Sequence, residues 1–229
     1  MNPQPPLPAA VLWDMDGTLI DSEPYWIEAE TALVERFGGT WSEEDGLTLV
    51  GRPLPYSARI LQGRGVALPE DEIVATLTAS VAERIRGAVP WQEDARALLQ
   101  EVVAAGVPCA LVTMSYRRMA DALLAAVPEA FQVVVTGDEV RHGKPDPESY
   151  LLAAHRLGVD IARCVAIEDS PSGIGAAWSS GAATIAVRRL AELEARPGLT
   201  RLTTLDGLGL EGIRAIANGE VRDELTGGA

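Results

Sequence analysis

Lysine, histidine and cysteine are all scarce in this sequence of 229 residues. Lys144 is the one lysine among 19 lysine and arginine residues, and there are two histidines. Two histidines are too few to build a metal site from histidine ligands. The two cysteines, Cys109 and Cys164, each lie inside an apolar run, which favours buried free thiols over a disulfide bond.

Long hydrophobic runs and excess positive charge are also missing. No apolar run approaches the roughly 18–20 residues that a membrane-spanning helix needs. The first ten residues are rich in proline and hold neither a basic segment nor an apolar signal core, so we expect a cytoplasmic protein. The net charge of −14 disfavours nucleic acid and anionic membranes as partners, because both are polyanions. A small anionic substrate would need local cations or a metal ion at its site.

Short apolar runs alternate with helical patterns over most of the chain. Five runs lack polar alternation, which is typical of parallel strands covered on both faces: 9–13, 109–113, 132–136, 164–167 and 183–187, with a weaker sixth at 201–204. Helical patterns lie between them at 94–104, 116–126, 147–157 and 172–180, and Gly106, Gly158 and Gly181 follow three of these helices. This order predicts an α/β fold with a doubly wound, Rossmann-like parallel sheet.

Residues 21–88 interrupt the alternation. They contain helical patterns at 24–37, 53–61 and 71–86 and no clear strand. We therefore expect a helical domain at 21–88, inserted into a catalytic core made of residues 1–20 and 89–229.

Two carboxylates follow the first predicted strand. Asp14 and Asp16 are two residues apart, so on an extended segment their side chains point the same way. They would repel each other unless one is protonated or a cation lies between them. Ligands bind at the carboxyl ends of strands in such sheets, and Gly17 lets the chain turn sharply there. The alternative is a capped Asp-Gly turn without function.

The ends of the next strands are also polar. Thr113 ends the second run, and the helix after Ser115 would offer free N–H groups to an anion, although Ser115 could instead be an N-cap. Lys144 follows the third strand. In a chain that otherwise uses arginine, a lone lysine indicates a place that needs a compact point charge, or it survives by chance.

The fourth strand ends in Glu168 and Asp169. Acidic groups at this edge suit a hard cation such as Mg²⁺, which takes oxygen ligands. The alternative is helix capping by Asp169 or Ser170, with Pro171 at the first helical position. Capping does not explain why all four strand ends are polar together.

These four groups in order resemble the motifs of the haloacid dehalogenase-like hydrolases: Asp14-Met15-Asp16-Gly17-Thr18, Thr113, Gly143-Lys144-Pro145 and Glu168-Asp169-Ser170. The likeness extends from Val11 to Val187, and the helical insertion resembles the family's small cap. With Asp21-Ser22-Glu23-Pro24, the chain is most similar to the branch of β-phosphoglucomutase and small sugar-phosphate phosphatases.

The resemblance implies a role for each motif residue. Asp14 would attack phosphorus and form an aspartyl-phosphate, and Asp16 would act as general acid and then general base. Thr113 and Lys144 would hold phosphoryl oxygens, with Ser115 a further candidate contact. Mg²⁺ would be held by Asp14, the main-chain carbonyl of Asp16 and Asp169, with Glu168 as a further candidate.

Within this family the residues favour hydrolysis of a small phosphomonoester, most simply a sugar phosphate. Dehalogenases lack the second acid, and phosphonoacetaldehyde hydrolases need a cap lysine that residues 21–88 do not contain. A mutase is the alternative, but Trp26 stands where its cap histidine would align. A catalytically idle binding protein on the same fold is the alternative from another class.

The sequence leaves open the roles of Arg52 and Trp26 in the cap and the oligomeric state. Arg52 is either a contact to a sugar hydroxyl or second anionic group, or a solvated arginine. Tyr56 is expected in the cap core, and Trp26 either there or at the substrate. A monomer is compatible with the sequence.

Overall fold

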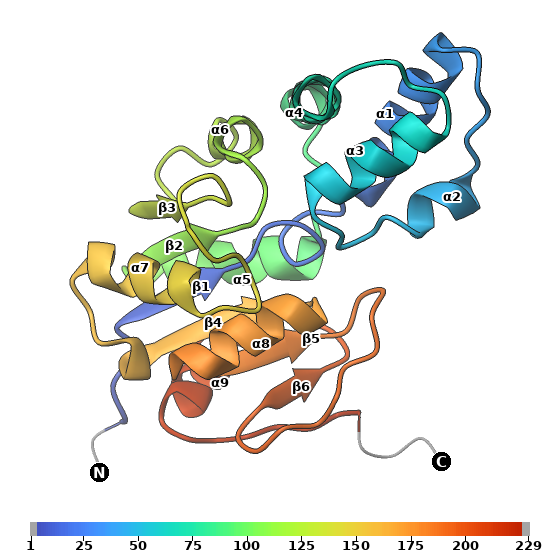
Figure 1. Cartoon of the computed structure of the whole chain (residues 1–229). Helices are drawn as coiled ribbons and strands as arrows, with labels where there is room; N and C mark the ends of the chain where they lie inside the picture. Colours follow the sequence, from blue (N-terminus) through green and yellow to red (C-terminus); the bar gives the residue numbers. More distant parts are fainter. Residues whose placement is uncertain (1–3, 226–229) are drawn as a thin grey trace.

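Six parallel strands form one sheet in a computed structural model of the chain, which describes residues 4–225 (Figure 1). The strand order is β3-β2-β1-β4-β5-β6, so the chain winds outward from β1 in both directions, as predicted. The predicted strands are confirmed, including the weak sixth: β1 (Ala10–Trp13), β2 (Cys109–Val112), β3 (Val133–Val135), β4 (Cys164–Glu168), β5 (Ala183–Val187) and β6 (Thr200–Leu202). Residues 1–3 of the proline-rich start and residues 226–229 of the predicted core lie outside the described part.

Both faces of the sheet are covered by helices. On β1, Val11 and Trp13 belong to one buried cluster and Ala10 and Leu12 to another, because successive strand side chains point to opposite faces. The first cluster includes α5 (Glu93–Ala104) and α9 (Gly209–Ala217); the second includes α7 (Glu148–Leu157) and α8 (Pro171–Ser180). The remaining core elements are α6 (Arg117–Leu124) and a short 3-10 helix, η1 (Ile161–Arg163).

Several local expectations are confirmed. Gly106, Gly158 and Gly181 have φ of +71°, +71° and +90°, the left-handed conformation that ends a helix with least strain in glycine. Cys109 and Cys164 are buried free thiols. The sequence did not predict η1 or α9.

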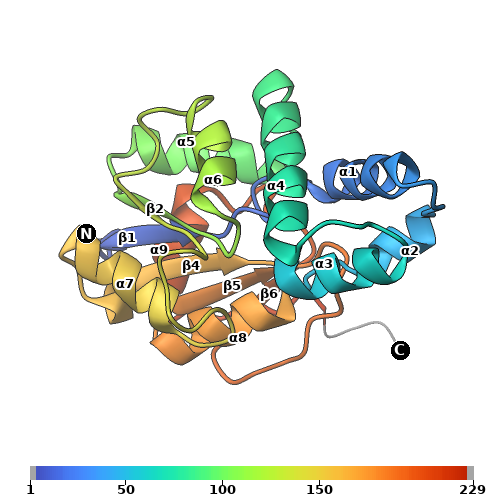
Figure 2. The same ribbon diagram turned by 45° about the horizontal axis from the view of Figure 1, so that its top comes forward.

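Four helices and no strand lie within residues 21–88, between β1 and α5 (Figures 1 and 2). They are α1 (Glu23–Arg36), α2 (Glu43–Leu47), α3 (Leu54–Gly63) and α4 (Glu70–Gly87), of which the five-residue α2 was not predicted. We call this part, residues 21–88, the helical segment. It stands beside the sheet, and α4 packs against α6.

The two connections between the sheet and the helical segment lie side by side. The amide of Asp21 donates to the carbonyl of Pro90 at 2.8 Å, and the amide of Gln92 donates to the carbonyl of Leu19 at 2.9 Å. The segment therefore leaves and rejoins the core at one place, near the predicted boundaries. That it is a separate domain stays a prediction.

Within residues 4–225, we find no helix with the length and apolar character needed to cross a membrane.

Candidate active site

The polar ends of β1, β2 and β4 meet at one edge of the sheet. β1 pairs with β2 and β4, and Trp13 at its end lies opposite Leu111 on one side and Ile167 on the other. Parallel strands in this register bring together Glu168, the last residue of β4, and the residues that follow the three strands, Asp14, Thr113 and Asp169; all four are buried.

Lys144 connects these strand ends. Its Nζ lies 2.6 Å from Asp14 Oδ1, 2.6 Å from Glu168 Oε1 and 2.9 Å from the carbonyl oxygen of Val112. An ammonium has three hydrogens, so all three are used. The side chain is only 4% exposed, so this is a buried charge with every donor paired.

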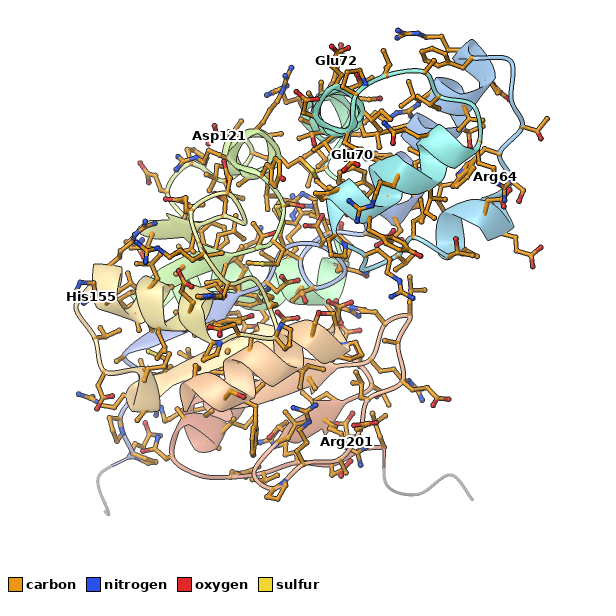
Figure 3. The ribbon with its side chains drawn as sticks, in the orientation of Figure 1. Arg64, Glu70, Glu72, Asp121, His155 and Arg201 are labelled. Atoms are coloured by element: carbon orange, nitrogen blue, oxygen red, sulfur yellow. The ribbon has the colours of Figure 1, made fainter. Side chains whose placement is uncertain are left out.

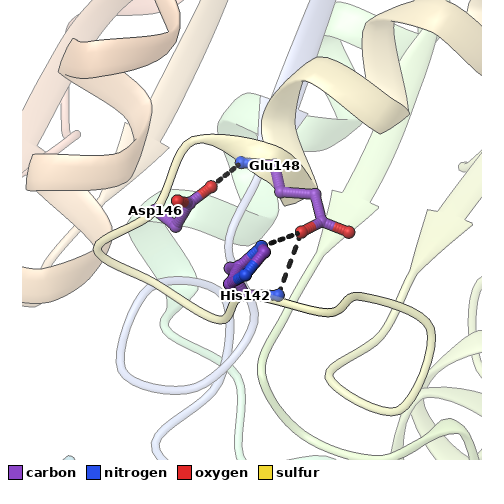
Figure 4. Close-up of side chains that lie close together, drawn as sticks. All are labelled: His142, Asp146 and Glu148. Atoms are coloured by element: carbon purple, nitrogen blue, oxygen red, sulfur yellow. Dashed lines mark hydrogen bonds and ion pairs between the residues drawn. The ribbon is translucent and has the colours of Figure 1, made fainter.

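The loop that carries Lys144 is closed by its own side chains (Figure 4). The carboxylate of Glu148 accepts the amides of Arg141 and His142 at 2.9 Å each and contacts the His142 ring at 3.0 Å. Asp146 accepts the amide of Glu148 at 2.9 Å. His142, Asp146 and Glu148 thus lie together outside the buried cluster and shape the loop that delivers Lys144 to the sheet edge.

Asp16 lies among hydroxyl groups. Its Oδ1 accepts a hydrogen bond from Ser22 at 2.6 Å, and its Oδ2 accepts from Ser115 at 2.7 Å and Thr113 at 3.2 Å. The N-cap of α6 is Tyr116, so Ser115 is not the cap that its position allowed. The structure therefore brings Asp16, Thr113 and Ser115 together. None of these three side chains is a hydrogen-bond partner of the Lys144 ammonium.

Gly17 and Thr18 pack against Asp169. Thr18 Oγ1 donates to Asp169 Oδ1 at 3.0 Å. Gly17 has φ of +86°, and a Cβ there would lie 2.2 Å from Asp169 Oδ2. Glycine is needed at this turn because both its conformation and the nearby carboxylate exclude a side chain.

Glu168 is fully occupied by donors. Besides Lys144, its Oε1 accepts the hydroxyl of Tyr150 at 2.7 Å. Its Oε2 faces the amides of Asp169 and Ser170 and the Ser170 hydroxyl, at 3.2 to 3.4 Å. A carboxylate has about four lone-pair positions, so little of Glu168 is left for another ligand.

Negative charge exceeds positive charge in this cluster. Oxygens of Asp14, Glu168 and Asp169 lie within 4.8 Å of one another around the single Lys144. Burial and the Glu168 charge raise the pKa of Asp169 to about 7 and also raise the pKa of Asp14. Burial opposes the charge of Lys144, but Asp14 and Glu168 outweigh it and raise its pKa. A divalent cation at Asp14 and Asp169 would remove the excess charge, and the all-oxygen donor set fits a hard cation.

A model of the haloacid dehalogenase-like hydrolase family matches residues 8–181 of the chain. The chain belongs to this family. A phosphorylated carbohydrates phosphatase of Thermotoga maritima is 34% identical over 178 residues, covering 75% of this chain and 81% of the relative. Hexitol phosphatase A of Escherichia coli is 34% identical over 197 residues, covering 79% and 83%. The solved structure of CbbY from Rhodobacter sphaeroides in complex with phosphate has a TM-score of 0.80 and 28% identity, covering 90% of this chain and 99% of that chain.

Within residues 4–225, no hydrogen bond or ion pair joins the hydrolase's cap candidates to the buried cluster. Arg52 is exposed in the loop before α3, with its guanidinium 5.5 Å from the Tyr56 ring centre and no carboxylate partner among residues 4–225. The expectation that Tyr56 is cap core is wrong: it is 39% exposed, because α3 buries its opposite face through Ala58 and Leu61. Trp26 is partly buried and packs against the core.

Most other charged groups of the hydrolase lie at its surface. Arg64, Glu72, Asp121 and His155 are exposed, and none contacts the buried cluster (Figure 3). Arg201 is buried, but it pairs with Asp223 at 2.7 Å near the other end of the chain. At the sheet edge, by contrast, the buried carboxylates of Asp14 and Glu168 pair with the buried Lys144.

Three residues near the site were not found from the sequence. Tyr150 follows Lys144 in an apolar helical pattern that predicts packing only. Ser22 and Glu23 lie in the Asp21–Pro24 string, which indicated the branch but no contact. Glu23 is half-buried and its carboxyl group has no hydrogen bond or ion pair within residues 4–225, and burial, Asp16 and Glu30 raise its pKa to about 7.

Proposed function

We propose that this chain is a Mg²⁺-dependent phosphatase that cleaves small sugar or sugar-alcohol phosphates through a phospho-aspartate on Asp14. That it is a phosphatase follows from its family and its named relatives; the proposal concerns mechanism, metal and substrate. The observation that carries it is the buried contact of Lys144 with Asp14 beside Asp169.

Asp14 is the proposed nucleophile. Its carboxylate oxygen attacks phosphorus, the bond to the leaving oxygen breaks, and water later hydrolyses the aspartyl-phosphate. Asp16 would protonate the leaving oxygen and then deprotonate that water. Lys144, Thr113 and Ser115 would hold phosphoryl oxygens, which requires the two hydroxyls to turn from Asp16.

Asp14, Asp169 and the main-chain carbonyl of Asp16 would hold Mg²⁺. The bound ion would neutralise carboxylate and phosphoryl charge so that one anion can approach another. We assign Glu168 to Lys144 rather than to the metal, because its oxygens already accept Lys144, Tyr150 and the Ser170 hydroxyl. Without the ion, the raised pKa of Asp14 would leave the nucleophile protonated more of the time.

The substrate class rests on the relatives and on the helical segment, which we propose as a cap over the sheet edge. Two of the relatives are named phosphorylated carbohydrates phosphatase and hexitol phosphatase A. In the segment, exposed Arg52 is available to a sugar hydroxyl or a second anionic group, and Glu23 to a sugar hydroxyl. We place the enzyme in the cytoplasm, where the free thiols of Cys109 and Cys164 would stay reduced.

The test is a phosphate-release screen with the purified chain. Hexose and hexitol phosphates, phosphoglycolate, nucleotides and pyrophosphate are each assayed with Mg²⁺ and with excess chelator. We expect the highest kcat/KM on a sugar or sugar-alcohol phosphate and loss of turnover on chelation. Faster turnover of pyrophosphate or a nucleotide would contradict the substrate class, and unchanged rates in chelator would contradict the metal requirement.

A further inference from the structure

Tyr150 lies beneath the buried lysine. It is fully buried in the first turn of α7, two residues after Glu148. Its ring centre is 5.2 Å from Lys144 Nζ, close enough for a cation–π contact, and its hydroxyl donates to Glu168 Oε1 at 2.7 Å. Tyr150 therefore contacts Lys144 directly through its ring and indirectly through Glu168.

Lys144 is shared between two carboxylates at equal distance. Nζ lies 2.6 Å from Asp14 Oδ1 and 2.6 Å from Glu168 Oε1, and the Tyr150 hydroxyl donates to that same Glu168 oxygen. A hydrogen bond to a carboxylate withdraws negative charge from the accepting oxygen. Without the hydroxyl, Oε1 would attract Nζ more strongly, and the ammonium would move away from Asp14.

We propose that Tyr150 is a positioning residue for the active site: its hydroxyl occupies Glu168 and its ring supports the ammonium, so that Lys144 stays directed at Asp14 and the phosphoryl group. This inference rests on the function proposed above. Burial and the Glu168 charge raise the pKa of Tyr150 well above its usual range, which favours the hydroxyl as a hydrogen-bond donor to Glu168.

The test begins with Tyr150→Phe, which removes the hydroxyl and keeps the ring. We expect kcat to fall about tenfold, the effect of one hydrogen bond to a charged group, with little change in KM. Tyr150→Leu, which also removes the ring contact, should lose more. Thr184→Val is the matched control: it deletes another buried hydroxyl, on β5, whose bond goes to the Ala182 carbonyl, and kcat should stay within about twofold.

A double-mutant cycle separates positioning from packing. Glu168→Gln alone should be strongly impaired, and adding Tyr150→Phe should cost little further activity, because the hydroxyl acts through Glu168. Fully additive losses in kcat would overturn the proposal. So would a Tyr150→Phe enzyme with unchanged kcat, or one that loses melting temperature but no rate. Failure of the proposed function would differ, because the unsubstituted chain would then release no phosphate, and both proposals would fall.

Discussion

The sheet edge and the helical segment differ in how their buried carboxylates are paired. At the edge, Asp14 and Glu168 meet a buried lysine, and Asp169 accepts the hydroxyl of Thr18. In the segment, Glu30 is buried, and the indole of Trp41 is the only hydrogen-bond donor to its carboxylate within residues 4–225, at 3.2 Å.

The cations of the two regions also differ in burial and in pairing. Lys144 is almost fully buried and paired with two carboxylates, whereas Arg52 of the segment is exposed and has no carboxylate partner within residues 4–225. Fixed and desolvated charges suit chemistry, because they need no rearrangement as the reaction proceeds. Exposed and unpaired charges suit recognition, because they gain their partners when a substrate binds. The predictions below test this division, which assigns kcat to the edge and KM or stability to the segment.

The largest effect is expected at the nucleophile. Asp14→Asn replaces a carboxylate with an amide of similar shape that is a poor nucleophile and a weaker metal ligand. We expect kcat to fall roughly 10⁵-fold or more, with the fold retained by circular dichroism. Activity of more than a few per cent of the wild-type value would argue against a phospho-aspartate.

Asp16→Asn should rank second, with a loss of about 10²–10⁴-fold in kcat from removal of the general acid and base. The loss should be smaller for a nitrophenyl phosphate, whose leaving group needs no proton, than for an alkyl phosphate. Both substrates are compared on the same enzyme preparation. Equal losses on the two substrates would contradict the role of Asp16 as general acid, but not the role of Asp14 as nucleophile.

Lys144→Arg keeps the charge and changes its shape. A planar guanidinium is too large for the space between Asp14, Glu168 and the Val112 carbonyl, and it should displace the phosphoryl group from line. We expect a fall of roughly 10²–10³-fold in kcat/KM. Lys144→Met is the comparison variant, because it keeps length and removes charge. If the arginine enzyme is near wild type and only the methionine enzyme fails, charge alone matters here.

Arg52→Gln should change KM rather than kcat. If the guanidinium binds substrate, its loss costs a charge-assisted hydrogen bond, so KM should rise about tenfold with kcat nearly unchanged. Arg59→Gln is the matched control, since Arg59 is exposed on the neighbouring α3 and pairs with Glu70. The same KM in both variants would make Arg52 a solvated arginine.

The smallest effect concerns stability. Burial raises the pKa of Glu30 from 4.5 to about 7, so the folded chain resists ionising it while the unfolded chain does not. Stability is therefore unaffected by this group below about pH 4.5 and falls as pH rises towards about 7. Glu30→Gln removes a penalty of at most about 3 kcal/mol, so its melting temperature should exceed wild type by a few degrees at pH 8 and by much less at pH 5. Glu35→Gln, exposed on the same helix, should show no such trend.

Sequence reasoning located the sheet and the polar strand ends because both depend on local patterns. Apolar runs mark strands wherever they pair, and the carboxyl ends of parallel strands must share an edge. Tyr150 could not be found this way, because its helical spacing is that of any core residue and its partner, Glu168, is 18 residues away. The role of Glu168 could not be found this way either. As an acidic residue it was a candidate metal ligand, but in the fold five hydrogen-bond donors surround its carboxylate. Tyr56 was misjudged because aromatic character does not say which face of a helix is buried.

The paired connections at Asp21–Pro90 and Leu19–Gln92 make the helical segment a module with adjoining ends. Joining two ends that already touch costs little chain entropy, and the cost grows only slowly with the length inserted. The segment could therefore be replaced by a different set of helices without disturbing the strands that carry Asp14 and Asp169. With the cap role proposed above, substrate preference would change by exchange of one continuous stretch of gene, while the hydrolytic chemistry is inherited intact.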